Sequence, residues 1–114
     1  MEKKKDICID FDGVLNKYTG WQGEEYVASM REGCDSFLEE LAKDFKITIF
    51  TTRRVDLVTK WLEKYSLNEY VYRITDKKVP AFLYIDDRAL CFNGDYVDIS
   101  RQIYSFKPYW NKNV

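Results

Sequence analysis

The spacing of hydrophobic positions divides the first half of the chain into alternating short strands and helices. Lys5 to Phe11 is an apolar, β-rich run that ends before Gly13, and it predicts a first strand. Cys34 to Phe45 carries apolar residues three and four positions apart, which is typical of an amphipathic helix. Lys46 to Thr51 is a β-branched run too short for a helix, and Val55 to Tyr65 repeats the helical spacing. The pattern predicts the order strand, helix, strand, helix.

The second half continues this alternation with shorter elements. Tyr70 to Ile74 and Ala81 to Ile85 predict two further strands, and the second is apolar enough for both of its faces to be covered, as in a parallel sheet. Asn93-Gly94 is a turn signal, and Val97 to Phe106 predicts a last helix that covers the sheet. Residues 16–30 have no helical spacing, so we expect a loop or a hairpin-like flap there. The alternation predicts a three-layer α/β sandwich around a central parallel sheet.

Length and composition favour one folded domain over residues 1–114. The chain has 114 residues, 46% of them hydrophobic and 32% charged, which is typical of a soluble globular protein. Its apolar runs are far shorter than the roughly 20 residues of a membrane-spanning helix. Asp10 and Asp12 interrupt the apolar stretch that a secretory signal would need. We therefore expect a cytoplasmic protein with no membrane association.

Three features of the composition narrow the chemistry. The chain has no histidine, which excludes an imidazole base and any histidine metal ligand. Cys8, Cys34 and Cys91 lie too far apart for a zinc motif and do not form an even set for disulfides. The net charge of −1 argues against binding nucleic acid along the whole surface. Carboxylate, lysine, hydroxyl and thiol chemistry remain.

Polar side chains follow three of the predicted strands, at the edge where parallel strands end together and where open α/β sheets bind ligands. Asp10 and Asp12 are two residues apart, so in extended chain both side chains point the same way. Gly13 permits a tight turn that exposes backbone N–H groups beside them. A hard divalent cation, Mg²⁺, would resolve the repulsion between the carboxylates. The alternatives are an acidic turn without function and a Ca²⁺ loop, whose ligand spacing is not met.

The adjacent carboxylates of Asp86 and Asp87 follow the fourth strand. Without a cation nearby each would raise the pKa of the other. The pair also fits an ordinary turn, in which Arg88 neutralises it. Its significance therefore comes from its combination with the first acidic pair.

Two further elements have the chemistry to bind an anion. Thr51 and Thr52 follow the second strand where a helix opens, so hydroxyls and N-terminal amides there favour a phosphate, although Thr52 as a simple helix cap is an equal alternative. Lys77 and Lys78 precede the fourth strand and either deliver an ammonium to a phosphoryl oxygen or stay solvated.

Four segments in order, DFDGVL, FTTR, Lys78 and IDD, resemble the four motifs of the haloacid dehalogenase superfamily over residues 10–87. The resemblance implies a Rossmann-like fold, Mg²⁺ and phosphoryl transfer. It implies that Asp10 is the nucleophile that forms an aspartyl-phosphate, and that Asp12 is the general acid and then the base, which favours a phosphatase. Thr51 would hold a phosphoryl oxygen and Lys78 would neutralise charge.

The resemblance also implies a set of ligands for the metal and the substrate phosphate. Mg²⁺ would be bound by Asp10, Asp12 through its backbone carbonyl, and Asp86, with Asp87 in support or acting through water. The phosphate would be bound by Thr51, Thr52, Lys78 and Gly13. Thr52 could replace Thr51, and Lys77 could replace Lys78.

The intervals between the motifs leave no room for a cap domain, so we expect an open site. Such a site takes a small phosphorylated molecule, a phosphorylated protein or a nucleic-acid end, or borrows a lid from a neighbour in a homo-oligomer. Tyr18, Trp21 and Tyr26 of the flap either stack on a base or sugar or simply pack. The leading hypothesis is a Mg²⁺-dependent phosphomonoester hydrolase. The alternatives are a catalytically idle phosphate- or metal-binding interaction module and a phosphotransferase or phosphomutase, which would need a site that keeps water out.

Overall fold

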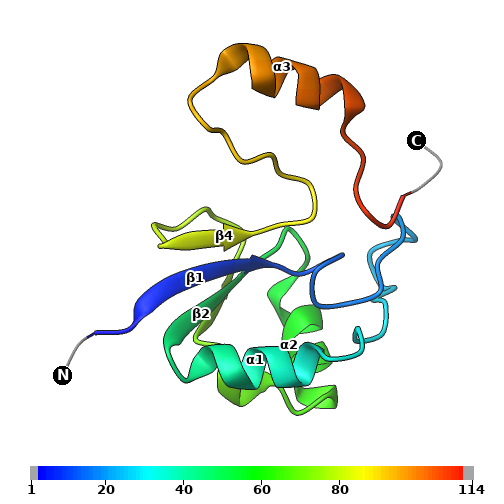
Figure 1. Cartoon of the computed structure of the whole chain (residues 1–114). Coiled ribbons are helices and arrows are strands. Elements are labelled where there is room, and N and C mark those ends of the chain that lie inside the picture. The colour runs from blue at the N-terminus through cyan, green and yellow to red at the C-terminus, as the bar shows by residue number, and fades with distance from the viewer. Residues whose placement is uncertain (1–2, 112–114) are drawn as a thin grey trace.

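The computed structural model describes residues 3–111 and contains a four-stranded parallel sheet in the order β3-β2-β1-β4 (Figure 1). The strands are β1 (Lys5–Asp10), β2 (Phe45–Phe50), β3 (Arg73–Thr75) and β4 (Leu83–Ile85). The helices are α1 (Cys34–Ala42), α2 (Val55–Lys64), α3 (Tyr96–Ser105) and the short 3₁₀ helix η1 (Asn68–Tyr70). The predicted α/β class with a central parallel, Rossmann-like sheet is confirmed.

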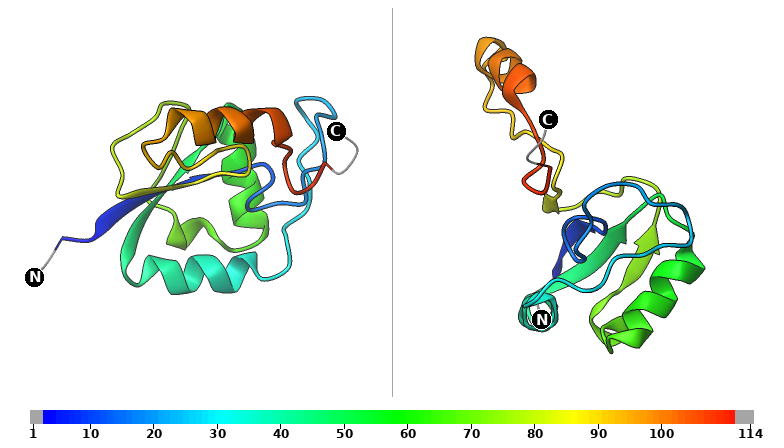
Figure 2. Two further views of the ribbon diagram at one scale, coloured as in Figure 1. Left: turned by 45° about the horizontal axis from the view of Figure 1, so that its top comes forward. Right: turned by 90° about the vertical axis from the view of Figure 1, so that its right-hand side faces the viewer.

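The path of the chain places a change of direction between β1 and β4. From β1 the chain steps through α1 to β2 and through α2 to β3, so both helices lie on the same face of the sheet (Figures 1 and 2). It then returns to β4, on the other side of β1. In open α/β sheets this kind of reversal marks the place where ligands bind, at the carboxyl ends of the strands.

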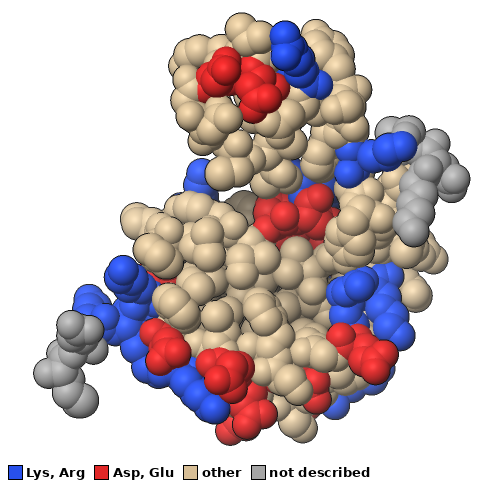
Figure 3. All heavy atoms as spheres, viewed as in Figure 1, with Lys and Arg blue, Asp and Glu red and all other residues tan. Residues whose placement is uncertain are grey.

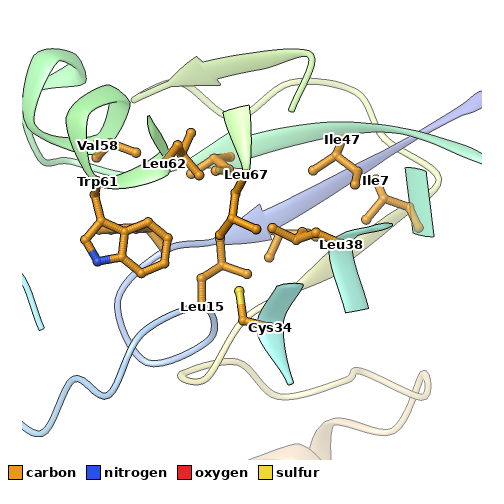
Figure 4. Close-up of a cluster of buried hydrophobic side chains, with 12 residues drawn as sticks. Ile7, Leu15, Cys34, Leu38, Ile47, Val58, Trp61, Leu62 and Leu67 are labelled. Carbon is orange, nitrogen blue, oxygen red and sulfur yellow. The ribbon is translucent and has the colours of Figure 1, made fainter. Parts of the chain in front are cut away.

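The hydrophobic core lies between the sheet and the α1–α2 layer. Alternation along β1 and β2 directs Ile7, Ile9, Ile47 and Ile49 towards the helices, and all four are almost fully buried. The cluster in Figure 4 is completed by residues from both helices and the neighbouring loops: Phe11, Leu15, Cys34, Leu38, Val58, Trp61, Leu62 and Leu67. This core fixes the ends of β1 and β2 and therefore the residues that follow them.

Two predictions about the opposite face are wrong. The last helix forms, but it does not cover the sheet: none of its residues is buried, and α3 stands away from the strands on the side opposite α1 and α2 (Figures 1 and 2). The strand predicted from Ala81 is only Leu83–Ile85, and its Leu83 and Tyr84 are 46% and 42% exposed rather than covered on both faces. Helix α3 forms for a local reason, because the Asp95 side chain accepts from the N–H groups of Val97 and Asp98 at its start.

The flap, residues 16–30, is a loop closed at its base by one antiparallel bridge between Asn16 and Met30. Inside it the indole N–H of Trp61 in α2 donates to the carbonyl of Ala28 at 2.9 Å, which ties the flap to the core. Residues 70–74, predicted as a strand, divide differently because Asn68–Tyr70 wind into η1 and pairing with β2 begins only at Arg73. Within residues 3–111 we find no helix that is both long and apolar enough to span a bilayer.

Candidate functional site

The strand register brings the predicted residues to one edge of the sheet. Ile9 pairs with Ile85, so Asp86 falls level with Asp10 at the ends of β1 and β4. Asp10 itself pairs with Phe50, so Thr51 follows directly on the other side. We call this edge, where the strands end, the carboxyl edge. The site therefore lies at the reversal of the chain path.

Three carboxylates meet there. One oxygen each from Asp10, Asp86 and Asp87 lies within 4.8 Å of the other two. Figure 3 shows acidic side chains gathered in the hollow between the body and the segment that carries α3. Burial, a hydrogen bond with the Asp87 side chain and the charges of Asp86 and Asp87 raise the pKa of Asp10 to about 8. Asp10 therefore holds a proton near neutral pH unless positive charge is supplied.

The chemistry of this donor set fits a hard divalent cation. The donors are carboxylate oxygens only, which suits Mg²⁺ or Ca²⁺ better than softer metals. A cation would favour the ionised form of Asp10 against the burial and the neighbouring carboxylates that raise its pKa. Asp10, Asp86 and Asp87 are therefore the side chains that could hold it.

The side chain of Asp12 lies outside this group. Its Oδ2 accepts a hydrogen bond from Arg53 Nε at 2.7 Å, in an ion pair whose arginine side chain is only 3% exposed. Its Oδ1 accepts from Asn16 Nδ2 at 3.0 Å. Both oxygens are engaged, so Asp12 is held at the site without being among the side chains that could bind the metal.

Gly13 and Asn16 shape the turn after β1. Gly13 has a φ of 88°, and a side chain there would collide with the Asp87 carboxylate and press tightly on the Trp110 indole, so this close approach favours glycine. The Gly13 N–H donates to Asn16 Oδ1 at 3.1 Å. The amide that the sequence suggested for phosphate is therefore occupied within the turn.

Thr51 and Thr52 differ in their surroundings. Thr51 is buried, its N–H donates to the carbonyl of Thr75, and its hydroxyl accepts from the N–H of Arg53. Thr52 is exposed. The expectation that these threonines open or cap the helix is wrong, because α2 begins at Val55 with Arg54 in the N-cap position. Both threonines still line the cavity described below.

Two cavities flank Asp10 and Asp86. One, of about 270 Å³, lies towards β2 and the flap and is lined by Asp10, Asp12, Tyr18, Trp21, Phe50, Thr51, Thr52, Arg53, Asp86 and Arg88. The other, of about 260 Å³, lies over β4 and includes Lys78, Tyr84 and Cys8 beside the same two aspartates. Of the two predicted lysines, Lys78 lines this cavity, and its ammonium lies 4.8 Å from the centre of the Tyr84 ring. Asp10 is thus accessible from both sides.

Sequence reasoning missed four residues that organise the site. Arg53 binds Asp12, Asn16 binds the turn after β1, and Tyr109 and Trp110 reach the site from beyond α3. Arg53 belongs to the FTTR segment, so the sequence shows that it is close to Thr51. The sequence does not show that its side chain pairs with Asp12. Tyr109 and Trp110 could not be found, because they lie beyond the last predicted helix, after Pro108, in a short segment without a motif.

An acidic cluster at the carboxyl edge of a Rossmann-like parallel sheet, flanked by threonine and lysine, is typical of haloacid dehalogenase-like phosphatases. The chain belongs to the NLI interacting factor-like phosphatase family, whose model matches residues 3–97. A comparison with curated proteins gave no match. A conserved protein of known structure from Bacteroides thetaiotaomicron is 18% identical and aligns with a TM-score of 0.60 over 98% of this chain and 99% of that one, which supports the fold.

Proposed function

We propose that the chain is a Mg²⁺-dependent phosphomonoester hydrolase that works through an aspartyl-phosphate on Asp10. The phosphatase class follows from the family. The metal-dependent mechanism rests on the convergence of Asp10, Asp86 and Asp87, whose oxygens lie within 4.8 Å of one another at the carboxyl edge. Thr51 and Lys78 line the two cavities that adjoin this cluster.

In this proposal Asp10 is the nucleophile, and its position supports that role. It ends β1 in the buried centre of the sheet, and it lines both cavities from which a phosphate ester can approach. A carboxylate oxygen attacks phosphorus, the bond from phosphorus to the ester oxygen breaks, and a water molecule later hydrolyses the aspartyl-phosphate. Bound Mg²⁺ supplies charge neutralisation for the carboxylates and the phosphoryl oxygens.

Asp12 is the proposed general acid and base: it gives a proton to the leaving group and takes one from the attacking water. Arg53 and Asn16 fix both of its oxygens. Each carboxylate oxygen accepts one of these bonds and keeps a second lone pair, so Asp12 can give a proton to the leaving oxygen and take one from water while it stays in place. Arg53 therefore sets the position of the acid–base group.

The remaining groups supply positive charge and hydrogen bonds to the phosphoryl oxygens. Thr51 and Thr52 face the same cavity as Asp10, and Arg88 lines it from the loop after β4. Lys78 approaches from the cavity on the other side. Cations on both sides of the attacked phosphorus stabilise the charge that develops on its oxygens.

We further propose that residues 1–114 act as one catalytic domain in the cytoplasm. Cys8 and Cys34 are buried free thiols and Cys91 is an exposed one, which suits a reducing compartment. One cavity lies beside the flap and the other beside β4 and the loop that follows it. We propose that the substrate is either a small phosphorylated molecule or the phosphorylated end of a macromolecule.

The test is hydrolysis of an aryl phosphate by the purified protein with Mg²⁺ and with a chelator, beside Asp10→Asn. We expect turnover with Mg²⁺, none with chelator, and a loss of about a thousandfold or more in Asp10→Asn. In Asp12→Asn we expect slow turnover and a phosphorylated protein detectable by mass spectrometry, because the water that releases phosphate lacks its base.

Mg²⁺-dependent activity that survives in Asp10→Asn would exclude the aspartyl-phosphate mechanism. A folded wild-type protein that binds Mg²⁺ but hydrolyses neither aryl phosphate nor a panel of sugar phosphates, nucleotides and phosphorylated oligonucleotides would favour an interaction module.

A further inference from the structure

The segment after α3 returns to the carboxyl edge of the sheet and contacts the site. Figure 1 shows the chain leaving α3 and descending beside the flap, and we call residues 106–111 the return segment. Its Trp110 donates the indole N–H to Oδ2 of Asp87. Its Tyr109 hydroxyl donates to the carbonyl of Gly13, in the turn after β1. These residues lie beyond the part of the chain that the family model matches, which ends at residue 97.

The indole ring is held in place on several sides. The Tyr18 ring packs edge-on against it, with centroids 5.0 Å apart and planes at 73°. The Arg88 guanidinium lies 6.0 Å from the ring centre. Gly13 leaves room on a third side, because a side chain at that position would collide with the Asp87 carboxylate and press tightly on the Trp110 indole. The indole N–H is therefore presented to Asp87 by a packed environment rather than by a free side chain.

Asp87 is the member of the acidic cluster with the least support from its own strand. It stands two residues beyond the end of β4, whereas Asp10 ends β1 inside the sheet and Asp86 accepts a hydrogen bond from the N–H of Arg88 at 2.9 Å. A carboxylate that helps to bind a metal is usually oriented by a further hydrogen bond. Trp110 supplies one to Asp87.

We propose that Trp110 is a positioning residue of the active site, which orients the Asp87 carboxylate for divalent cation binding and so makes the return segment part of the metal site. The inference rests on the proposed function, because it assumes that the acidic cluster binds a cation. Trp110 acts through Asp87 and touches neither metal nor substrate in this role.

The decisive variant is Trp110→Phe, which keeps an aromatic ring against Tyr18 and Arg88 but removes the N–H donor. The matched control is Trp21→Phe, which makes the same chemical change at an indole that is 63% exposed and lies beside Arg53, not beside Asp87. Binding of Mn²⁺ alone, measured by titration calorimetry and by the electron paramagnetic resonance of free Mn²⁺, reports the site without any need for turnover. Thermal unfolding of each metal-free variant checks the fold.

We expect Trp110→Phe to weaken Mn²⁺ binding by about tenfold or more, the usual effect of losing a hydrogen bond to a metal ligand. Trp21→Phe should bind Mn²⁺ as the wild type does. Wild-type affinity in folded Trp110→Phe would overturn the inference while leaving the proposed function intact. A folded wild-type protein that binds no Mn²⁺ would overturn the metal site and the inference with it, so the two failures are distinguishable.

If Trp110→Phe also lowers the melting temperature, a double-mutant comparison separates an effect through Asp87 from an effect on the fold. In an Asp87→Asn background the charged partner is gone, so adding Trp110→Phe should weaken Mn²⁺ binding by no more than about threefold further. The same tenfold loss in both backgrounds would show that Trp110 acts on the fold rather than through Asp87, and would overturn the inference.

Discussion

Asp10 shares the carboxyl edge of the sheet with Asp86 and Asp87, and this crowding determines its charge state. Burial is the largest cause of its raised pKa, followed by the hydrogen bond with Asp87 and the two neighbouring charges. A cation would reverse these effects, because it favours the ionised carboxylate. Ionisation of Asp10 and binding of a cation are therefore linked.

This linkage predicts how the stability of the metal-free protein depends on pH. The pKa of Asp10 is about 8 in the folded protein, against about 4 in an unfolded chain. Between these values the folded state keeps a proton that the unfolded state releases, so the free energy of unfolding should fall as pH rises from about 4 to about 8. Asp10→Asn has no such proton to lose, so thermal unfolding in chelator should show a flatter pH profile for this variant.

Mg²⁺ supplies an internal control for that experiment. Saturating Mg²⁺ should raise the melting temperature of the wild type most at the high-pH end, where the metal-free site is least stable. It should raise that of Asp10→Asn much less. Parallel pH profiles for wild type and Asp10→Asn in chelator would contradict the linkage.

Among the larger elements, the flap is held by two buried side chains, Trp61 and Arg53, and Arg53 is the one that also reaches the site. Its Nε binds Asp12, and its NH1 donates to the carbonyl of Glu24 at 3.1 Å, so one guanidinium joins the turn after β1 to the flap. The Trp21 ring centre lies 5.2 Å from the same guanidinium. A substitution that removes this guanidinium should therefore make the flap more mobile and displace the Asp12 side chain at the same time.

We predict that Arg53→Ala loosens the flap and destabilises the fold by about 3 kcal/mol, because it leaves Asp12 partly buried without its charged partner. Hydrogen exchange should accelerate in residues 17–29 but change little in α1. Arg54→Ala is the matched control: its pairs with Glu25 and Asp56 lie in solvent, so its loss should change the free energy of unfolding far less than Arg53→Ala does. Equal effects of the two substitutions would refute the special role of Arg53.

The sequence predicts most helices and strands of the fold, and it does so where burial of one face produces a regular spacing of apolar residues. The starts of α1 and α2 coincide with the predicted ones at Cys34 and Val55, because their apolar faces are covered by the sheet. The acidic cluster could be predicted because parallel strands bring their carboxyl ends to one edge. The contacts of Trp110 and Arg53 could not, because they join positions distant in the chain through side chains that carry no periodic signal.

For the whole molecule, the structure separates a packed body from a helix with little support. The buried residues lie in and around β1, β2, α1 and α2, whereas in α3 Val97, Ile103 and Tyr104 are 62%, 58% and 92% exposed. The chain on either side of α3 is anchored at the site, through Asp86 and Asp87 before it and Tyr109 and Trp110 after it. Substitutions of these exposed side chains of α3 should therefore have little effect on the stability of the body.

Native-state hydrogen exchange tests this division. Amides of β1 and β2 should exchange only through global unfolding, whereas those of α3 should exchange through local opening at a much lower free energy, because no buried contact holds the helix. Tyr104→Ala should leave the melting temperature unchanged, since its ring is almost fully exposed. Leu38→Ala, in the core, should cost about 3 kcal/mol. Protection of α3 equal to that of β2, at protein concentrations where the chain is monomeric, would mean that the helix packs on the open face of the sheet in solution.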